Sequence, residues 1–338
     1  MKAALYEGKK KIRIVDLPKP TPQKGEALVK VKFAGICGSD LEFYKTGLWP
    51  TPCVLGHEIT GTIAELGSEI KRWKIGDRVT IAPGLSCGKC YYCQRGYTNL
   101  CDGSFEGIGV GKNGGFEEFV LVPERCLISL PDTVPFKHGT VFDQIGTGVM
   151  ALKEANFIAG NSAVILGLGT IGQFMFQCCK IAGASTIVVI EKNRYRLEIA
   201  KRFEPDMALS KLSLSKIKRA NKRGVSGADF IFECSGAPIL VNAALDLVRK
   251  GGTIVQIGIW DKPLEINLLK YVINQNRIQG VIGCNREDFE FAIDLVARKL
   301  INPDPIITKI IPLDDIIEEG FECGIDPETK EIKILVAP

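Results

Sequence analysis

Residues 162–172, SAVILGLGTIG, constrain the fold of this chain more than any other segment. An apolar run leads into three glycines at the spacing G-x-G-x-x-G, and the helical pattern QFMFQCCKIAGA follows at once. A strand that ends in such a turn and opens directly into a helix is typical of the first βα unit of a doubly wound sheet. The segment therefore predicts a parallel α/β domain.

The residues on either side of this motif, from about 151 to 284, continue the alternation. TIVVIEK, ADFIFECSG and TIVQIGI are short apolar runs, and NRYRLEIAKRF and NAALDLVRKGG between them have helical patterns. Continuous Val/Ile runs suit strands that are buried on both faces of a parallel sheet. We therefore predict that residues 151–284 form the doubly wound domain.

Residues 1–150 have a different texture. ALVKVKFAGICG, GTIAELG, GDRVTIAP and FEEFVLVP are short strand-like runs separated by glycines and prolines, which indicates a mostly β domain. The tail, residues 285–338, combines one helical pattern, REDFEFAIDLVARKL, with the strand-like PIITKIIPL and EIKILVAP. Periodicity leaves open whether this tail extends the α/β domain or returns to the first domain.

Composition limits the classes of function. A net charge of +4 over 338 residues is too small to indicate nucleic-acid binding. The N-terminal segment lacks the apolar core of a signal peptide, and no run of about 18 apolar residues indicates a membrane span. We therefore expect a cytoplasmic protein. A reducing compartment keeps thiols free, so a tight group of cysteines there favours a metal site over disulfides.

Four cysteines form such a group within CGKCYYCQRGYTNLC: Cys87, Cys90, Cys93 and Cys101. Four thiolates satisfy the tetrahedral demand of Zn²⁺ and leave no open position, as in structural zinc sites. An iron–sulfur cluster is one alternative, but its usual run closes with C-x3-C-P, whereas here the last gap has seven residues. Uncoordinated thiols are the other. The spacing predicts a structural zinc site.

The glycine motif also predicts a dinucleotide site. Gly167 permits the tight turn, Gly169 lets backbone approach the pyrophosphate, and Gly172 allows close packing of helix on strand. We place the pyrophosphate at the helix N-terminus, with Thr170 and Ile171. Glu191 ends the next apolar run, where an acid binds the ribose hydroxyls of NAD and repels the 2′-phosphate of NADP. NAD is therefore favoured over NADP, although three nearby cations could tolerate the phosphate: Lys192, Arg194 and Arg196. A glycine turn without a nucleotide is the alternative.

A second metal site is suggested by His57, which Glu58 follows directly and Cys37 precedes by twenty residues. Cys, His and a carboxylate can hold Zn²⁺ while leaving one position open for substrate. On spacing alone, a buried structural histidine and a core cysteine explain these residues equally well.

The motifs taken together resemble the zinc-dependent medium-chain alcohol and polyol dehydrogenases, and within them the sorbitol, butanediol and threonine dehydrogenases. The resemblance covers essentially the whole chain, because GICGSD, LGHEITG, GDRV, the four cysteines, NGGFEEFVLVP, GLGTIG, ADFIFECSGA and REDFEFAIDL stand in the family's order. It implies a GroES-like catalytic domain at residues 1–150, with 285–338 returning to it, and a Rossmann domain at 151–284. It also implies two Zn²⁺ ions per chain, one catalytic and one structural, and a homotetramer or homodimer.

The resemblance assigns residues to the catalytic metal. Cys37 and His57 would bind the zinc, and Glu58 would be a third or exchanging ligand. Asp143, in VFDQIGTG, matches an acidic position at or near the metal, so the carboxylate ligand stays open between these two acids. Asp40 would orient His57 through its second ring nitrogen.

Further roles follow from the same resemblance. Ser39 would hydrogen-bond the substrate hydroxyl and pass on its proton, Thr147 would lie beside the nicotinamide, and Arg196 would contact the adenosine ribose. Glu42 stands where many relatives have a histidine that exports the proton. A carboxylate can also relay protons, so we assign Glu42 to that path.

The implied reaction is hydride transfer from a secondary alcohol or polyol to the nicotinamide, which yields a ketone, in a cleft between the two domains. An L-threonine 3-dehydrogenase is an alternative that Glu42 weakens, since the relay histidine is characteristic there. A sugar-phosphate dehydrogenase, a zinc-free reductase of the same fold and a non-catalytic protein are the others. We expect a small-molecule substrate and no nucleic-acid or membrane partner.

Overall fold

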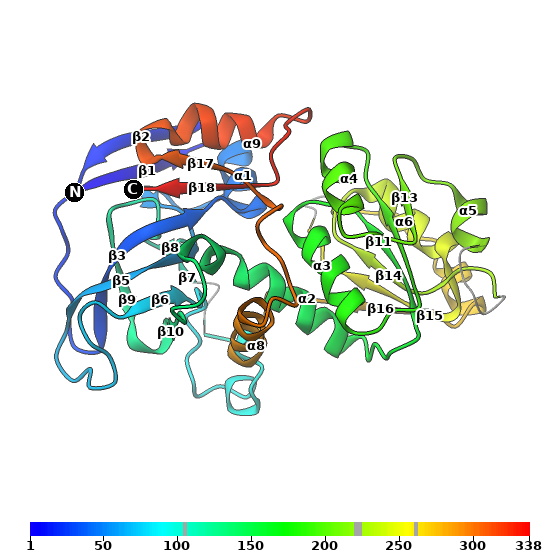
Figure 1. Cartoon of the computed structure of the whole chain (residues 1–338), viewed down its shortest axis with the longest axis horizontal. Coiled ribbons are helices and arrows are strands. Elements are labelled where there is room, and N and C mark those ends of the chain that lie inside the picture. The colour runs from blue at the N-terminus through cyan, green and yellow to red at the C-terminus, as the bar shows by residue number, and fades with distance from the viewer. Residues whose placement is uncertain (104–106, 220–224, 260–262) are drawn as a thin grey trace. The chain divides into compact units, whose positions relative to one another are not determined.

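Two units divide the chain in the computed structural model, which describes residues 1–103, 107–219, 225–259 and 263–338 (Figure 1). Unit 1 contains Met1–Asp143 and Asn285–Pro338, and unit 2 contains Gln144–Cys284. The C-terminal segment therefore returns to the unit that holds the N-terminus. In Figure 1 the red strand β18 lies among the blue strands of unit 1.

Unit 1 is built mainly from short antiparallel strands. One sheet has the order β2-β1-β4, a second has the order β10-β6-β5-β3-β18-β17 with β9 also paired to β3, and β7 pairs with β8. The strands are β1 (Lys2–Gly8), β2 (Lys11–Asp16), β3 (Glu26–Gly35), β4 (Cys53–Val54), β5 (Glu58–Leu66), β6 (Arg78–Ile81), β7 (Gly107–Ile108), β8 (Gly111–Lys112), β9 (Phe119–Pro123), β10 (Leu127–Ser129), β17 (Ile307–Pro312) and β18 (Lys333–Ala337).

Helices in unit 1 are few and short. They are α1 (Gly38–Thr46), α8 (Arg286–Ala297) and α9 (Cys323–Ile325), the 3-10 turns η1 (Cys93–Arg95), η2 (Thr98–Leu100), η3 (Glu124–Cys126), η4 (Phe136–Val141) and η5 (Leu313–Asp315), and the π-helical segment η6 (Ile316–Glu322). Helix α2 (Phe142–Glu154) crosses from unit 1 into unit 2. The prediction of a mostly β first domain is confirmed.

The core of unit 1 lies under β3, β5 and β18. Alternate residues of β3, such as Val29 and Val31, are buried against the sheet's other apolar side chains. Strand β18 differs because Ile334, Leu335 and Val336 are all buried. It pairs in antiparallel fashion with the end of β3 and in parallel fashion with β17. A continuous apolar run suits a strand covered on both faces, which explains why the C-terminal segment enters the middle of this sheet.

Unit 2 contains the predicted doubly wound sheet. All its strand pairs are parallel, and the order is β13-β12-β11-β14-β15-β16, so the direction of winding reverses between β11 and β14. The strands are β11 (Ser162–Leu166), β12 (Thr186–Ile190), β13 (Met207–Leu209), β14 (Ala228–Glu233), β15 (Val248–Gln256) and β16 (Arg277–Gly280). Every residue of β11, β12 and β14 is buried, as their continuous apolar runs predict.

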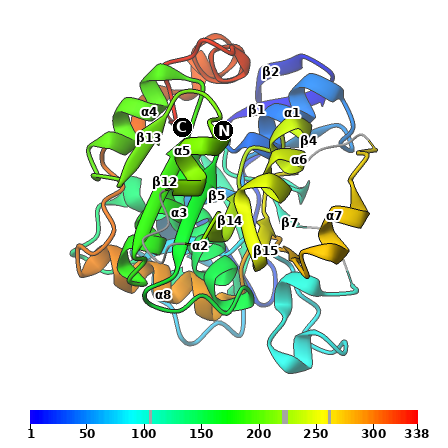
Figure 2. The same ribbon diagram turned by 90° about the vertical axis from the view of Figure 1, so that its right-hand side faces the viewer.

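Crossover helices surround this sheet, as Figure 2 shows. They are α3 (Thr170–Ile181), α4 (Arg194–Lys201), α5 (Leu214–Arg219), α6 (Pro238–Leu247) and α7 (Leu268–Ile273). Helix α4 begins at Asn193, whose side chain accepts hydrogen bonds from the backbone N–H groups of Tyr195 and Arg196. Within the described residues, no helix has the length and apolar character needed to cross a bilayer.

Candidate catalytic, metal and cofactor sites

Cys37, His57 and Glu58 meet in unit 1. One potential ligand atom from each lies within 4.8 Å of the other two, and His57 and Glu58 are buried. Cys37 is the residue at which α1 begins, and Glu58 opens β5 opposite Gly35 at the end of β3. A Cβ atom at residue 35 would collide with the Glu58 carboxylate, so glycine is required there. Sulfur, imidazole nitrogen and carboxylate oxygen are the donor types of open zinc sites, so the group fits the predicted ion.

Asp40 connects the first two of these residues. Its Oδ2 accepts a hydrogen bond of 2.9 Å from the backbone N–H of Cys37, which caps α1. Its Oδ1 lies 3.6 Å from Nδ1 of His57, and neither of these two buried atoms has another hydrogen-bond partner among the described residues. This placement leaves Nε2 as the ring nitrogen available to a metal. Burial opposes protonation of His57, but the charges of Asp40 and Cys37 outweigh it and raise its pKa well above the ordinary value.

Lys333 is a member of this site that the sequence did not reveal. Its Nζ donates to Glu58 Oε1 at 2.8 Å, to Glu58 Oε2 at 2.6 Å and to the carbonyl oxygen of Ile36 at 2.9 Å. The side chains of Lys333 and Glu58 are 1% and 0% exposed. The available signal was a single lysine inside the apolar run of residues 332–336. As the structure stands, the Glu58 carboxylate is neutralised by Lys333.

The remaining predicted residues of the catalytic site lie on two helices. Ser39 is half-buried in the first turn of α1, and Glu42 is exposed on the same helix with its carboxylate 2.7 Å from Nζ of Lys45. Asp143 is half-buried in the first turn of α2, and Thr147 is buried one turn later. Asp143 is not a member of the group of ligand atoms described above.

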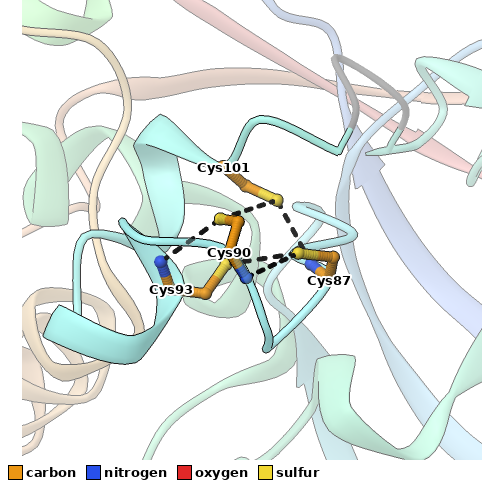
Figure 3. A group of neighbouring side chains, drawn as sticks. All are labelled: Cys87, Cys90, Cys93 and Cys101. Atoms are coloured by element: carbon orange, nitrogen blue, oxygen red, sulfur yellow. Dashed lines mark hydrogen bonds between the residues drawn. The ribbon is translucent and has the colours of Figure 1, made fainter.

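The four cysteines of the predicted structural site converge, as Figure 3 shows. The Sγ atoms of Cys87 and Cys93 are 4.0 Å apart, and those of Cys90 and Cys101 are also 4.0 Å apart. A disulfide needs about 2.05 Å between sulfurs, so these thiols are not bonded to one another. Four sulfurs at about 2.3 Å from one Zn²⁺ would lie close to 4 Å apart, so the spacing fits a tetrahedral ion.

Backbone geometry shapes this cysteine lobe. Gly88 and Gly96 have φ values of +71° and +83°, which turn the chain back toward itself. Backbone N–H groups point at the sulfurs: that of Cys90 lies 3.3 Å from Cys87 Sγ, and that of Cys87 lies 3.2 Å from Cys101 Sγ. Backbone N–H groups of Cys93 and Asp102 lower the pKa of Cys90 to about 6. The lobe therefore stabilises the thiolate form that binds a metal.

The glycine-rich loop connects β11 to α3 in unit 2. Gly167 has φ +87°, and a Cβ atom there would lie 2.7 Å from Cβ of Ser235, so both its backbone and its surroundings require glycine. A Cβ atom at Gly172 would collide with the carbonyl oxygen of Gly167. By contrast, a Cβ atom at Gly169 would meet nothing within 4 Å, and this residue begins α3 without a side-chain cap. The helix N-terminus beside Thr170 and Ile171 thus has the form of a phosphate site.

Glu191 holds the loop from the adjacent strand. Its Oε2 accepts from the backbone N–H of Leu168 at 2.7 Å, and its Oε1 accepts from that of Asn193 at 2.8 Å. Gln173, which the sequence did not reveal, donates through Nε2 to the carbonyl oxygen of Arg196 at 2.8 Å and to that of Leu168 at 3.4 Å. Glu191, Gln173 and Arg196 are therefore brought together at the carboxyl edge of the sheet. The buried Nε of Arg196 has no acceptor among the described residues.

A cavity of about 630 Å³ lies at the other edge of this sheet, where β14 and β15 begin. Its charged lining residues pair with one another: Arg249 Nε lies 2.6 Å from Asp229 Oδ1, and Lys270 pairs with Asp246. It is therefore distinct from the glycine-rich loop, which stands at the carboxyl ends of the strands.

Comparisons with known proteins agree with these sites. Residues 23–132 match the alcohol dehydrogenase GroES-like domain, and residues 170–298 match the zinc-binding dehydrogenase family. The (R,R)-butanediol dehydrogenase of Bacillus subtilis is 32% identical over 100% of both chains, and its crystal structure superposes with a TM-score of 0.89 over 100% of this chain and 99% of the other. L-Threonine 3-dehydrogenase of Shewanella baltica is 32% identical over 94% of each chain. A zinc-binding dehydrogenase of Sinorhizobium meliloti, solved with NADP bound, is 30% identical with a TM-score of 0.88, over 100% of this chain and 99% of that one.

Proposed function

Because this chain belongs to the zinc-dependent medium-chain alcohol and polyol dehydrogenases, we propose that it oxidises a secondary alcohol or polyol to a ketone with NAD⁺ as hydride acceptor. The observation that carries this proposal is the convergence of Cys37, His57 and Glu58 in a chain that also keeps an open glycine-rich loop. A zinc-free reductase would have no need of that buried set of three donors.

Cys37 and His57 would hold the catalytic zinc, with a carboxylate as the third ligand. When bound there, zinc supplies Lewis-acid chemistry that lowers the pKa of an alcohol hydroxyl toward neutrality. Asp40 fixes the ring of His57 from the Nδ1 side, and its capping bond to Cys37 holds the thiol at the start of α1. Glu58 would have to loosen its contacts with Lys333 to become that ligand, which makes it an exchanging ligand.

The proton of the substrate would leave through Ser39. Its position in the first turn of α1, two residues after Cys37, supports this role. Glu42 is one turn further along the same helix, exposed and paired with Lys45, so it is suited to the solvent end of the path. Its carboxylate would pass the proton to water. Thr147, on α2, is proposed to contact the nicotinamide.

The cofactor is proposed to be NAD rather than NADP. Glu191 keeps a buried carboxylate next to the backbone of the glycine-rich loop, where it would accept hydrogen bonds from the ribose hydroxyls. A 2′-phosphate would meet this negative charge. Arg196 would contact the same ribose through its guanidinium, whose buried Nε lacks an acceptor.

We also propose a second, structural zinc and self-association. Cys87, Cys90, Cys93 and Cys101 would hold the structural ion without leaving a position open. A homodimer or homotetramer is supported by apolar side chains of unit 2 that are exposed in the single chain, on α7 and near the edge strand β16: Leu268, Leu269, Val272, Ile273 and Ile282. Light scattering with size-exclusion chromatography measures this state.

One experiment tests the function directly. Initial rates are measured with NAD⁺ and NADP⁺ over vicinal diols, sugar alcohols, simple secondary alcohols, sugar phosphates and L-threonine, on protein whose zinc content is counted. We expect two zinc ions per chain and the highest kcat/KM with a diol or sugar alcohol and NAD⁺. One zinc ion per chain together with reductase activity would favour the zinc-free alternative. Turnover confined to L-threonine or a sugar phosphate would replace the proposed substrate class.

A further inference from the structure

Glu233 ends strand β14 with a carboxylate that is 0% exposed and accepts four hydrogen bonds. Its Oε1 accepts from the backbone N–H of Ser235 at 2.9 Å and from the hydroxyl of the same residue. Its Oε2 accepts from the backbone N–H of Gly236 at 3.0 Å and from Nε2 of Gln256 at 2.7 Å. In the part of the chain that the structure describes, no Lys or Arg pairs with Glu233. Its charge is therefore balanced by N–H and O–H dipoles alone.

The same residue also holds the end of the next strand. The carbonyl oxygen of Glu233 accepts from the N–H groups of Ile257 and Gly258 at 2.9 and 2.8 Å. Gln256 donates through Nε2 to the carbonyl oxygen of Gly258 at 2.7 Å as well as to the Glu233 carboxylate. Glu233 thus ties together the loop after β14 and the turn after β15.

This loop packs against the glycine-rich loop. Glu233 is in register with Leu166, the last residue of β11, and the N–H of Cys234 donates to the carbonyl oxygen of Leu166 at 2.9 Å. Gly167 must lack a side chain because Ser235 occupies the space beside it. The Ser235 hydroxyl accepts in turn from the N–H of Ala237, where α6 begins. The position of one loop therefore constrains the other.

The strand order indicates which part of a dinucleotide this arrangement serves. Ligands of doubly wound sheets bind outside the carboxyl ends of the strands where the winding reverses, here between β11 and β14. Each half of such a sheet takes one mononucleotide. Glu191 follows β12 in the half formed by β11–β13, which the proposed function gives to adenosine. The half formed by β14–β16, with Glu233, is then left for the nicotinamide mononucleotide.

We propose that Glu233 is a positioning residue for the nicotinamide half of the cofactor, an inference that rests on the proposed function. It acts through the loop of residues 234–237 and the turn at residues 257–258. Four donors aimed at one carboxylate fix both segments before the cofactor arrives, which removes the entropic cost of ordering them on binding. Glutamine has nearly the same size but carries an NH₂ group, which would face donors wherever it was placed.

The test compares NADH with AMP, which fills the adenosine half alone. Dissociation constants are measured for both ligands by titration calorimetry on zinc-loaded wild type and Glu233→Gln. We expect NADH binding to weaken about tenfold, the effect of one lost buried hydrogen-bonded contact. AMP binding should stay within about twofold, a difference that falls below the cost of any such contact. General damage to the fold would weaken both ligands together, so equal losses for AMP and NADH would overturn the proposal. Unchanged NADH binding by the folded variant would overturn it as well.

Asp229 offers a matched control on the same strand. It is also a buried acid, but it stands at the opposite end of β14, where it accepts from Ser162 and Arg249. Asp229→Asn should lower the midpoint of thermal unfolding without changing the ratio of the two dissociation constants. Ser235→Ala provides a milder variant that keeps the carboxylate; it should weaken NADH selectively by about threefold. If Glu233→Gln does not fold, an unaltered NADH affinity in Ser235→Ala decides against the proposal. A wild-type protein that binds neither ligand refutes the proposed function instead.

Discussion

Lys333 and Glu58 form a buried ion pair across 275 residues of sequence, with Nζ 2.6 Å from Oε2. The pair joins the first residue of β18 to the first residue of β5, next to His57. The C-terminal strand therefore contributes a charge to a site whose other residues all come from positions 37–58. This relationship explains why the tail has to return to unit 1 for the site to be electrically neutral.

Replacing Lys333 with methionine should destabilise the protein strongly. The variant leaves the Glu58 carboxylate buried without a cation, which costs about 3 kcal/mol in the free energy of unfolding. Urea unfolding of the zinc-loaded protein measures the change. Lys2→Met, which breaks the exposed ion pair with Asp314, is the control and should have a much smaller effect. Equal losses for the two variants would show that the Glu58 carboxylate does not need its partner.

Cys37→Ser should lose alcohol oxidation while retaining the cofactor site. We expect zinc content to fall from two ions to one, kcat to fall by roughly a thousandfold or more, and NADH affinity to stay unchanged, because Cys37 lies in unit 1 and the glycine-rich loop in unit 2. Metal counting, steady-state rates and NADH titration give the three readouts. Cys126→Ser, at a buried cysteine outside both metal groups, should keep two ions. An active variant with a single zinc would remove Cys37 from the mechanism.

Cys90→Ser should instead reduce stability. Removing one of four thiolates opens the structural site, so the ion there is lost and the midpoint of thermal unfolding falls by several degrees. The catalytic zinc should remain, and kcat per folded molecule should change by less than about threefold. Zinc counting and calorimetry separate this variant from Cys37→Ser. Retention of both ions would mean that the four cysteines do not hold a metal together.

Glu117 should make stability fall as pH rises. Burial raises the pKa of its carboxyl to about 8 from an ordinary value of 4.5. Below pH 4.5 both the folded and unfolded states hold the proton. Between pH 4.5 and 8 the unfolded state releases it while the folded state keeps it, so stability is lost progressively up to about pH 8 and is then constant. Glu117→Gln should therefore become more stable than wild type by about 2 kcal/mol near pH 8. Denaturant unfolding at pH 5 and pH 8.5 checks this, and a difference independent of pH would contradict it.

Glu191→Ser should weaken the preference for NAD⁺. Removing the carboxylate takes away both the acceptor for the ribose hydroxyls and the charge that opposes a 2′-phosphate. The ratio of kcat/KM for NAD⁺ to that for NADP⁺ should fall about tenfold or more. Since Glu191 also accepts from the N–H groups of Leu168 and Asn193, a uniform loss with both cofactors would assign it to loop structure alone.

The sequence by itself determined the features that depend on neighbouring residues. Apolar runs and helical periods gave the parallel sheet of unit 2 and the β character of unit 1, because side-chain periodicity is set by local backbone geometry. The four-cysteine spacing and the G-x-G-x-x-G turn were likewise readable within short stretches, and the structure brings each set together. The metal and cofactor roles of these residues remain predictions.

Only the tertiary structure decided which distant residues complete the sites. Periodicity could not place the tail, whose strand β18 gains its position by pairing with β3. Lys333 and Glu233 carried no motif that indicated their contacts, and Asp40 was assigned to His57 by resemblance alone. The physical reason is that buried charges and donors must find partners in space, and spacing along the chain does not record which strand ends will lie side by side.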